Sequence, residues 1–334
     1  MPCTPTMLIN SLIREVISVN FLSPYNSKIM KNSFYLILLL LAWSSDAQSI
    51  QEKLGYSKDT KLLIIHADDI GVSHSENRAT ILAMEKGSVN SGSILVPCPW
   101  FPEIADYAKA HPEMDFGLHL ALTSEWKFYK WGPVAGAQAV PGLVDVNRFL
   151  YPDWDGVRNH ASAEEVEKEL RAQITTAQKY GINITHLDSH MMALFLKPEY
   201  IEAYQKVGKE FKLPILMTRE FIEWFEMDPA KIIGPNDIVI DRVYMASSED
   251  YKKGMKNYYT EVLRGLKPGL NEILLHAAYN DEEMKAVTVG FVDYGAAWRQ
   301  DDFDFFTSDA CKQLLKEEKI QLITWKEIKT KLIK

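Results

Sequence analysis

Short apolar segments alternate with amphipathic segments from about residue 61 onward, and this alternation constrains the fold more than any other feature. Repeated strand–helix units of this kind are typical of parallel sheets covered by helices. With eight or so units, we predict an α/β protein with a TIM-like (β/α) barrel, regular or irregular, rather than an open sheet. The expected strands cover 62–67, 92–96, 115–120, 184–187, 214–217, 236–240, 271–276 and 320–324. The expected helices cover 75–87, 100–110, 162–180, 198–211, 248–264, 308–318 and 325–333.

Bulk composition excludes some partners. The chain has 334 residues, of which 47% are apolar and 25% are charged, as in an ordinary globular protein. Its net charge of -8 and the lack of a Lys/Arg-rich run argue against nucleic acid or an anionic membrane surface as the main partner. We therefore expect no nucleic-acid partner.

Residues 30–47 have the pattern of a secretory leader. A basic start at Met30-Lys31 precedes an apolar run at 34–43, and small residues before Gln48 form a cleavage site. We interpret 30–47 as a signal peptide and 1–29 as lying upstream of the true start. The mature chain, 48–334, is then a single domain with its core at about 61–331, periplasmic or secreted, with no stable membrane anchor after leader cleavage. The alternatives are a membrane anchor or a buried helix.

Acids and histidines follow three of the expected strands. Asp68 and Asp69 close the segment 62–67, while His119 and His190 end two later apolar segments. Two adjacent buried carboxylates are costly unless a cation relieves them, and one carboxylate with two imidazoles is a donor set typical of catalytic divalent metals. The alternatives are hydrogen-bonded structural histidines and aspartates that cap the next helix. Positions 186, 188 and 190 should point the same way, so some of them would orient the ligands.

One long segment, 123–161, interrupts the alternation. It combines glycine and proline with seven aromatic residues, which are Trp126, Phe128, Tyr129, Trp131, Phe149, Tyr151 and Trp154. A long connection inside a compact domain is usually functional. Its aromatic faces suit sugar rings, and the equally weighted alternative is a lid that only packs over the barrel.

Five short motifs in this order extend the argument to a family. The combination in this order is specific, although no single motif is, and together they span most of the chain. They are His66-Ala-Asp-Asp-Ile-Gly71, Asn77-Arg78-Ala79, Gly117-Leu-His-Leu120, Thr185-His-Leu-Asp-Ser-His190 and Glu272-Ile-Leu-Leu-His276. From about residue 61 to 331, the chain resembles the YdjC-like (ChbG) carbohydrate deacetylases, which are related to polysaccharide deacetylases.

The resemblance implies roles for individual residues. It implies a divalent metal, magnesium or zinc, held by Asp69, His119 and His190. It further implies Asp68 as the general base and His276 as the general acid. Arg299 resembles the family's late arginine, which could pair with the base, and a surface salt bridge is the alternative. Two departures from the family pattern are His66 in place of an asparagine and Met191-Met192 in place of further histidines.

These residues suit amide hydrolysis, which needs an activated water, a stabilised oxyanion and a proton for the departing amine. We therefore predict a metal-dependent hydrolase that removes N-acetyl groups from acetylated amino sugars or their oligosaccharides. The alternatives are a barrel metallohydrolase acting on O-acetyl esters and an inactive carbohydrate-binding protein.

Overall fold

The computed structural model describes residues 48–333. The expected signal peptide at 30–47 and the upstream segment 1–29 lie outside the described residues. Within the described part of the chain, no helix is long and apolar enough to cross a membrane. Cys98 and Cys311 are both buried and form no disulfide.

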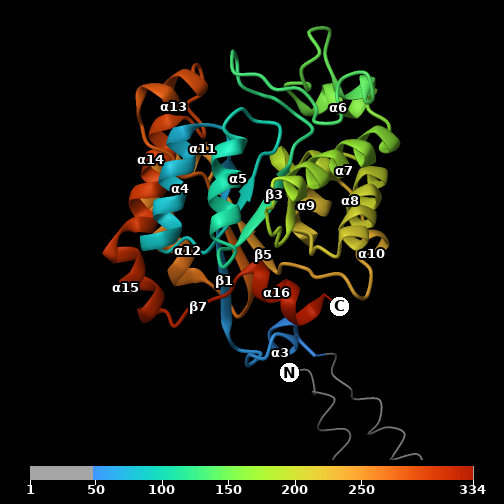
Figure 1. The fold of residues 1–334 in the computed structure, drawn as a ribbon. Coiled ribbons are helices and arrows are strands. Elements are labelled where there is room, and N and C mark those ends of the chain that lie inside the picture. Colours follow the sequence, from blue (N-terminus) through green and yellow to red (C-terminus); the bar gives the residue numbers. More distant parts are fainter. Residues whose placement is uncertain (1–47, 334) are drawn as a thin grey trace, which may run out of the picture. The chain divides into compact units, whose positions relative to one another are not determined.

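A parallel sheet forms the centre of the described chain (Figure 1). Among residues 48–333 it has seven strands, in the order β4-β3-β2-β1-β6-β5, and the seventh, β7, pairs with β1 beside β2. The strands are β1 (Lys61–Ile70), β2 (Ser91–Ile94), β3 (Phe116–Leu120), β4 (Leu187–Ser189), β5 (Arg242–Tyr244), β6 (Gly269–Leu275) and β7 (Gln321–Leu322). Because all of them are parallel, their carboxyl ends meet at one edge of the sheet.

The sheet is a half-barrel, so the expectation of a TIM-like barrel is only partly correct. Among the described residues, the gap between β4 and β5 is crossed only by single bridges, from Leu187 to Ile215 and from Thr218 to Ile240. The expected strands at 214–217 and 236–240 are thus reduced to one bridged residue each. Pro214 has no N–H to donate, and Thr218 already caps the next helix, so the segment is too short for a ladder.

Helices surround the outer face of the half-barrel. In Figure 1, α4 and α14 lie to the left of the strands and α7 and α8 to the right. Gly254, at φ 98°, divides the helix expected at 248–264 into α11 and α12. The helix α14 lies where the sequence predicted no helix. The α-helices are α3 (Ile50–Lys53), α4 (His74–Lys86), α5 (Phe101–Ala110), α6 (Trp154–His160), α7 (Ala163–Lys179), α8 (Pro198–Phe211), α9 (Arg219–Trp224), α10 (Pro229–Ile232), α11 (Ser248–Lys253), α12 (Met255–Gly265), α13 (Glu282–Val287), α14 (Ala296–Thr307), α15 (Asp309–Glu317) and α16 (Trp325–Leu332).

The concave interior of the half-barrel changes from apolar to polar along β1. Side chains alternate along a strand, so positions 62, 64, 66 and 68 face the same side. Leu62 and Ile64 belong to an apolar cluster that also contains Phe195. His66 and Asp68 follow them toward the carboxyl end, where both are buried. The apolar layer therefore forms a floor beneath a polar layer at the strand ends.

The long segment 123–161 is fastened to α7 by Glu169. Its carboxylate accepts hydrogen bonds from the backbone N–H groups of Val134 and Ala135, at 2.8 Å each, and from the Gln173 amide at 2.8 Å. Burial raises the pKa of Glu169 to about 7, although these donors favour the ionised form. The segment is thus anchored by a buried, titratable group.

We expect Glu169→Gln to weaken the pH dependence of stability. Between pH 4.5 and about 7, the folded protein retains a proton on Glu169 that the unfolded chain releases. The free energy of unfolding therefore falls as pH rises through this window, by on the order of 3 kcal/mol from this group. Urea denaturation at pH 5, 6, 7 and 8 measures the difference between the wild type and the variant. Parallel curves for the two proteins would contradict the assignment.

Candidate metal centre and active site

A bulge at the end of β1 turns the two adjacent aspartates toward different neighbours. The pairing of β1 with β2 shifts by one residue between Ala67 and Ile70, and Asp69 adopts a left-handed backbone with φ 64°. In a regular strand, Asp68 and Asp69 would face opposite sides of the sheet. The Asn77 side chain accepts a hydrogen bond from the N–H of Gly71 at 2.7 Å, which secures the turn that follows. The strained backbone at Asp69 thus lies within the candidate site.

Arg299 is buried and holds Asp69. Its Nη2 donates to Asp69 Oδ2 at 2.7 Å, and its Nη1 donates to both carboxylate oxygens of Glu76 at 2.9 Å. Arg299 is only 1% exposed, so the surface salt bridge considered from the sequence is wrong. Its partner is Asp69, the expected metal ligand, rather than Asp68, the expected base. Burial raises the pKa of Asp69, but Arg299 and His190 offset this and hold it well below its usual range.

Asp69, His119 and His190 converge at the carboxyl ends of β1, β3 and β4. Asp69 Oδ1 lies 3.5 Å from His119 Nε2 and 3.3 Å from His190 Nδ1, and the three side chains are buried. Asp69 Oδ1 has no hydrogen-bond partner, although it is buried. A buried oxygen left without a partner between two imidazole nitrogens fits a divalent cation. The three residues therefore form a donor set that could hold a metal.

Each of the two histidines is oriented by a carboxylate on its other ring nitrogen. Asp188 Oδ1 lies 2.5 Å from His119 Nδ1, and Glu125 Oε2 lies 2.9 Å from His190 Nε2. Such pairing fixes which nitrogen is free to bind a metal. The alternation of 186, 188 and 190 indicated a group like Asp188. Glu125 was missed because it lies in the segment 123–161, where no periodicity shows which way a side chain points.

Asp68 lies beside the three candidate ligands and also contacts His66 and Ser93 in the interior of the half-barrel. Its Oδ1 lies 3.2 Å from His66 Nε2 and accepts a hydrogen bond from Ser93 at 3.3 Å. Its Oδ2 lies 3.9 Å from His119 Nε2. The carboxylate thus faces the candidate metal centre with one oxygen and the interior with the other.

His276 approaches the same centre from the end of β6. Its Nε2 lies 3.8 Å from Asp69 Oδ2, its buried Nδ1 has no partner, and its side chain is 17% exposed. The backbone N–H donates to Asp302 Oδ2 at 3.0 Å, which fixes the end of the strand. Burial, together with the charge of Arg299, lowers the pKa of His276 to about 4, although Asp69 acts in the opposite direction. The imidazole is therefore neutral at pH 7.

Parts of the segment 123–161 cover this centre. The ring of Trp126 lies under the Arg299 guanidinium at 5.3 Å, and the ring of Trp131 lies 6.0 Å from that of His190. Both tryptophans are buried, so they pack as a lid rather than present open faces to a sugar. Phe128, at 73% exposed, is the aromatic residue of the segment with the most open surface.

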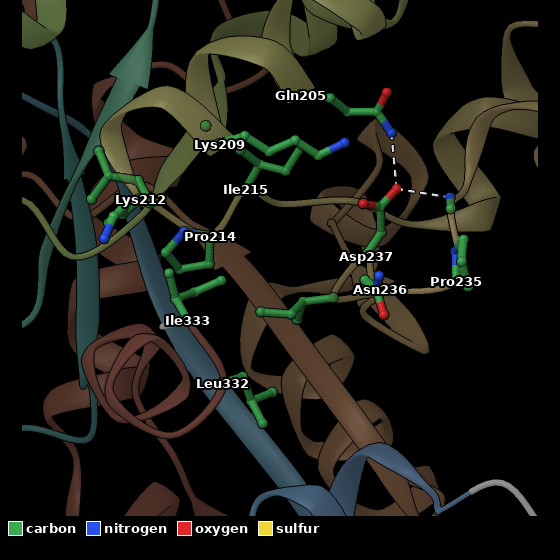
Figure 2. A pocket seen from close by; sticks show the side chains of 14 residues that line it. Gln205, Lys209, Lys212, Pro214, Ile215, Pro235, Asn236, Asp237, Leu332 and Ile333 are labelled. Atoms are coloured by element: carbon green, nitrogen blue, oxygen red, sulfur yellow. Dashed lines mark hydrogen bonds between the residues drawn. The ribbon is translucent and has the colours of Figure 1, made fainter.

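A cavity of about 450 Å³ lies away from this centre, between α8 and the segment 234–238 (Figure 2). Lys209, Lys212 and Asp237 are among the residues that line it, and the carboxylate of Asp237 accepts a hydrogen bond from Gln205. None of the expected catalytic or metal-binding residues lines this cavity. The expected site at the strand ends is therefore separate from this cavity.

A half-barrel of parallel strands with a candidate metal centre at the strand ends defines a barrel-like α/β protein. A family model described as "YdjC-like protein" matches residues 62–317, so the chain belongs to the YdjC-like family. A "Carbohydrate deacetylase" of Thermoanaerobacter pseudethanolicus is 26% identical over 269 residues, which are 80% of this chain and 100% of that protein. A "Carbohydrate deacetylase" of Brevibacillus brevis is 29% identical over 270 residues, 80% of this chain and 99% of that protein.

A solved structure supports the fold. The crystal structure of an Enterococcus faecalis V583 protein, described as a candidate cellobiose-phosphate cleavage protein, aligns with a TM-score of 0.66 and 22% identity. The alignment covers 80% of this chain and 99% of that one. At this level of identity, the likeness shows the shared fold.

We expect Glu125→Ala to weaken metal binding roughly 10–100-fold, because His190 loses the carboxylate that orients its ring. Titration of the metal-free protein with zinc, followed by calorimetry, measures the affinity. Glu199→Ala, at an exposed position on α8, is the matched control and should bind as the wild type does. Equal affinities for Glu125→Ala and the control would show that Glu125 does not support the site.

Proposed function

We propose that the protein is a divalent-metal-dependent carbohydrate deacetylase that removes N-acetyl groups from acetylated amino sugars or their oligosaccharides. The observation that carries the proposal is the unpartnered, buried Asp69 Oδ1 between His119 and His190. Membership of the YdjC-like family and the names of the two relatives, both carbohydrate deacetylases, support the same reaction.

Asp69, His119 and His190 would hold the metal, with magnesium or zinc as the proposed ion. A divalent ion at this position supplies Lewis acidity, which makes water a better nucleophile and polarises an acetyl carbonyl. Arg299 fixes Asp69 through one oxygen and leaves the other available. The buried setting strengthens these electrostatic interactions because little water screens them.

Asp68 and His276 would transfer the protons. Asp68 Oδ2 faces the candidate ligands and would accept the proton of the attacking water. His276 has an unpartnered ring nitrogen and would protonate the departing nitrogen. Because its imidazole is neutral at pH 7, the proton that Asp68 takes from the water would have to reach His276 before His276 donates it. The amine can then leave as a neutral group rather than as a strongly basic anion.

The proposed substrate class, an acetylated sugar, rests on membership of the family. The proposed location of the protein rests on the signal-peptide pattern in its sequence. An acetylated sugar would approach from the carboxyl ends of the strands, where Phe128 leaves an apolar surface. We further propose that the mature protein is periplasmic or secreted, because the sequence at 30–47 has the pattern of a signal peptide.

We expect acetate release from N-acetylated amino-sugar oligosaccharides to depend on metal. Dialysis against a chelator should abolish turnover, and zinc or magnesium should restore it. Parallel assays with O-acetylated sugars test the ester alternative. Activity that survives complete metal removal would contradict the mechanism, and sugar binding without any acetate release would favour the binding-protein alternative.

We expect Asp68→Asn to lower kcat by roughly 10²–10⁴-fold, because the amide cannot accept the proton. The bound metal should remain, since Asp69, His119 and His190 are unchanged. Acetate release and metal content measured on the same preparation separate these two effects. Asp106→Asn, at an exposed position on α5, is the control. Loss of the metal from Asp68→Asn would assign Asp68 to the ligands instead.

A further inference from the structure

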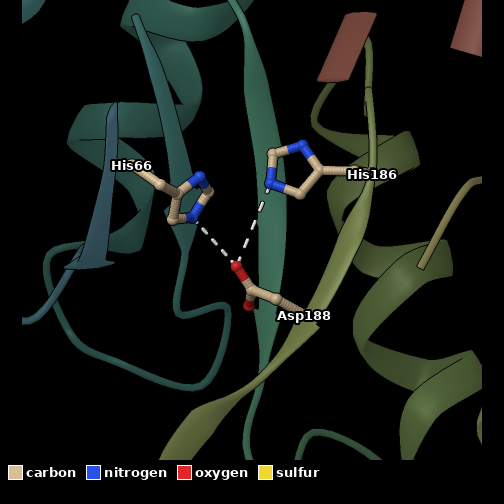
Figure 3. A group of neighbouring side chains, drawn as sticks. All are labelled: His66, His186 and Asp188. Carbon is tan, nitrogen blue, oxygen red and sulfur yellow. Dashed lines mark ion pairs between the residues drawn. The ribbon is translucent and has the colours of Figure 1, made fainter. Parts of the chain in front are cut away.

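A second group of metal-binding residue types lies beneath the candidate active site. His66 comes from β1, Asp188 from β4, and His186 immediately precedes β4 (Figure 3). His66 and His186 are 0% exposed and Asp188 is 2% exposed. Their ligand atoms lie within 4.8 Å of one another. This inner cluster is distinct from the outer set of Asp69, His119 and His190.

Both imidazoles of the inner cluster are held by oxygen atoms on Nδ1. The Nδ1 of His66 lies 3.0 Å from Ser91 Oγ, and the Nδ1 of His186 lies 2.9 Å from Thr185 Oγ1. The ring of Trp325 stacks on that of His186 at 5.2 Å, which fixes its plane. An oxygen partner on one ring nitrogen is the usual arrangement of a histidine whose other nitrogen binds a metal.

The Nε2 atoms of both rings face one carboxylate oxygen. Figure 3 shows both imidazoles directed at the Asp188 carboxylate. Asp188 Oδ2 lies 3.0 Å from His66 Nε2 and 3.9 Å from His186 Nε2. Neither Asp188 Oδ2 nor His186 Nε2 has a hydrogen-bond partner, although both atoms are buried. Buried polar atoms without partners are rare and destabilising, so two of them directed at one point indicate a bound group.

We propose that the inner cluster binds a second divalent cation through His66 Nε2, His186 Nε2 and Asp188 Oδ2. Asp68 Oδ1, 3.2 Å from His66 Nε2, is the nearest further carboxylate oxygen, and it stays with the outer site as the proposed base. Two imidazole nitrogens and one carboxylate oxygen form a donor set that suits a zinc ion. The inner ion would also position the outer site, because Asp188 Oδ1 holds His119.

The competing arrangement needs no metal. In it, His66 is an imidazolium paired with Asp68 and Asp188, and Ser93 Oγ, 3.1 Å from His66 Nε2, shares the hydrogen bonding. This arrangement leaves His186 Nε2 without a partner. The two arrangements differ in the number of metal ions that each chain binds, which can be measured without reference to activity.

The test begins with the full-length protein stripped of metal by a chelator, reloaded with zinc and desalted. Mass spectrometry of the metal should find two zinc ions per chain. Cobalt substitution should give visible absorption from two successive equivalents. Crystals of the zinc-loaded protein should show an anomalous difference peak among His66 Nε2, His186 Nε2 and Asp188 Oδ2. Saturation at one ion, with no peak at that point, would overturn the proposal, and this result does not depend on any variant.

Variants separate the inner site from the outer one. His186→Gln should retain one zinc ion, held by the outer set, and His119→Ala should retain one, held by the inner cluster. His111→Ala, at a partly exposed position away from both clusters, is the control and should retain two. A His186→Gln protein that still binds two ions would overturn the inner site. Conversely, a His119→Ala protein that keeps the wild-type content would count against the outer site and the proposed function, and would leave the inner site standing.

Discussion

The buried guanidinium of Arg299 is the interaction on which the arrangement of the candidate active site depends. It joins α14 to β1 and α4 by binding the carboxylates of Asp69 and Glu76. Two buried carboxylates that share one neighbourhood repel each other, and a single cation between them reduces that cost. Burial and the charge of Asp69 raise the pKa of Glu76 despite the opposing effect of Arg299, whereas Asp69 remains ionised. Because Arg299 occupies only Oδ2 of Asp69, the other oxygen stays free between the histidines.

The interior of the half-barrel is stable because its polar layer is satisfied from several elements at once. Leu62 and Ile64 provide an apolar floor, and above it His66 and Asp68 meet groups from β2 and β4. Low polarity strengthens each of these contacts and makes each missing partner more costly. Buried atoms that lack partners within a cluster of metal-binding residue types are therefore candidate ligand positions. Two of these positions, at Asp69 Oδ1 and at Asp188 Oδ2, belong to the outer and inner clusters.

Much of the fold could be predicted from the sequence, because hydrophobic periodicity is a local property. The apolar segment 62–67 and the amphipathic segment 198–211 became β1 and α8 with few changes in their bounds. Closure of the barrel could not be predicted, since it depends on ladder pairing across 214–217, which Pro214 and the early helix α9 prevent. The helix α14 was missed because its apolar residues do not form one regular stripe: Trp298, Phe305 and Phe306 are buried together with Arg299 and Asp302.

The sequence by itself determined which residues end the strands, and in parallel strands those positions must gather at one edge. Asp68, Asp69, His119, His190 and His276 could therefore be proposed as neighbours before any coordinates. Only the tertiary structure decided which atom faces which. The bulge at Asp69 separates the two aspartates, and distant elements supply Glu125, Arg299 and Glu76. Such pairings join residues far apart in the chain, and they depend on distances that only the packed fold sets.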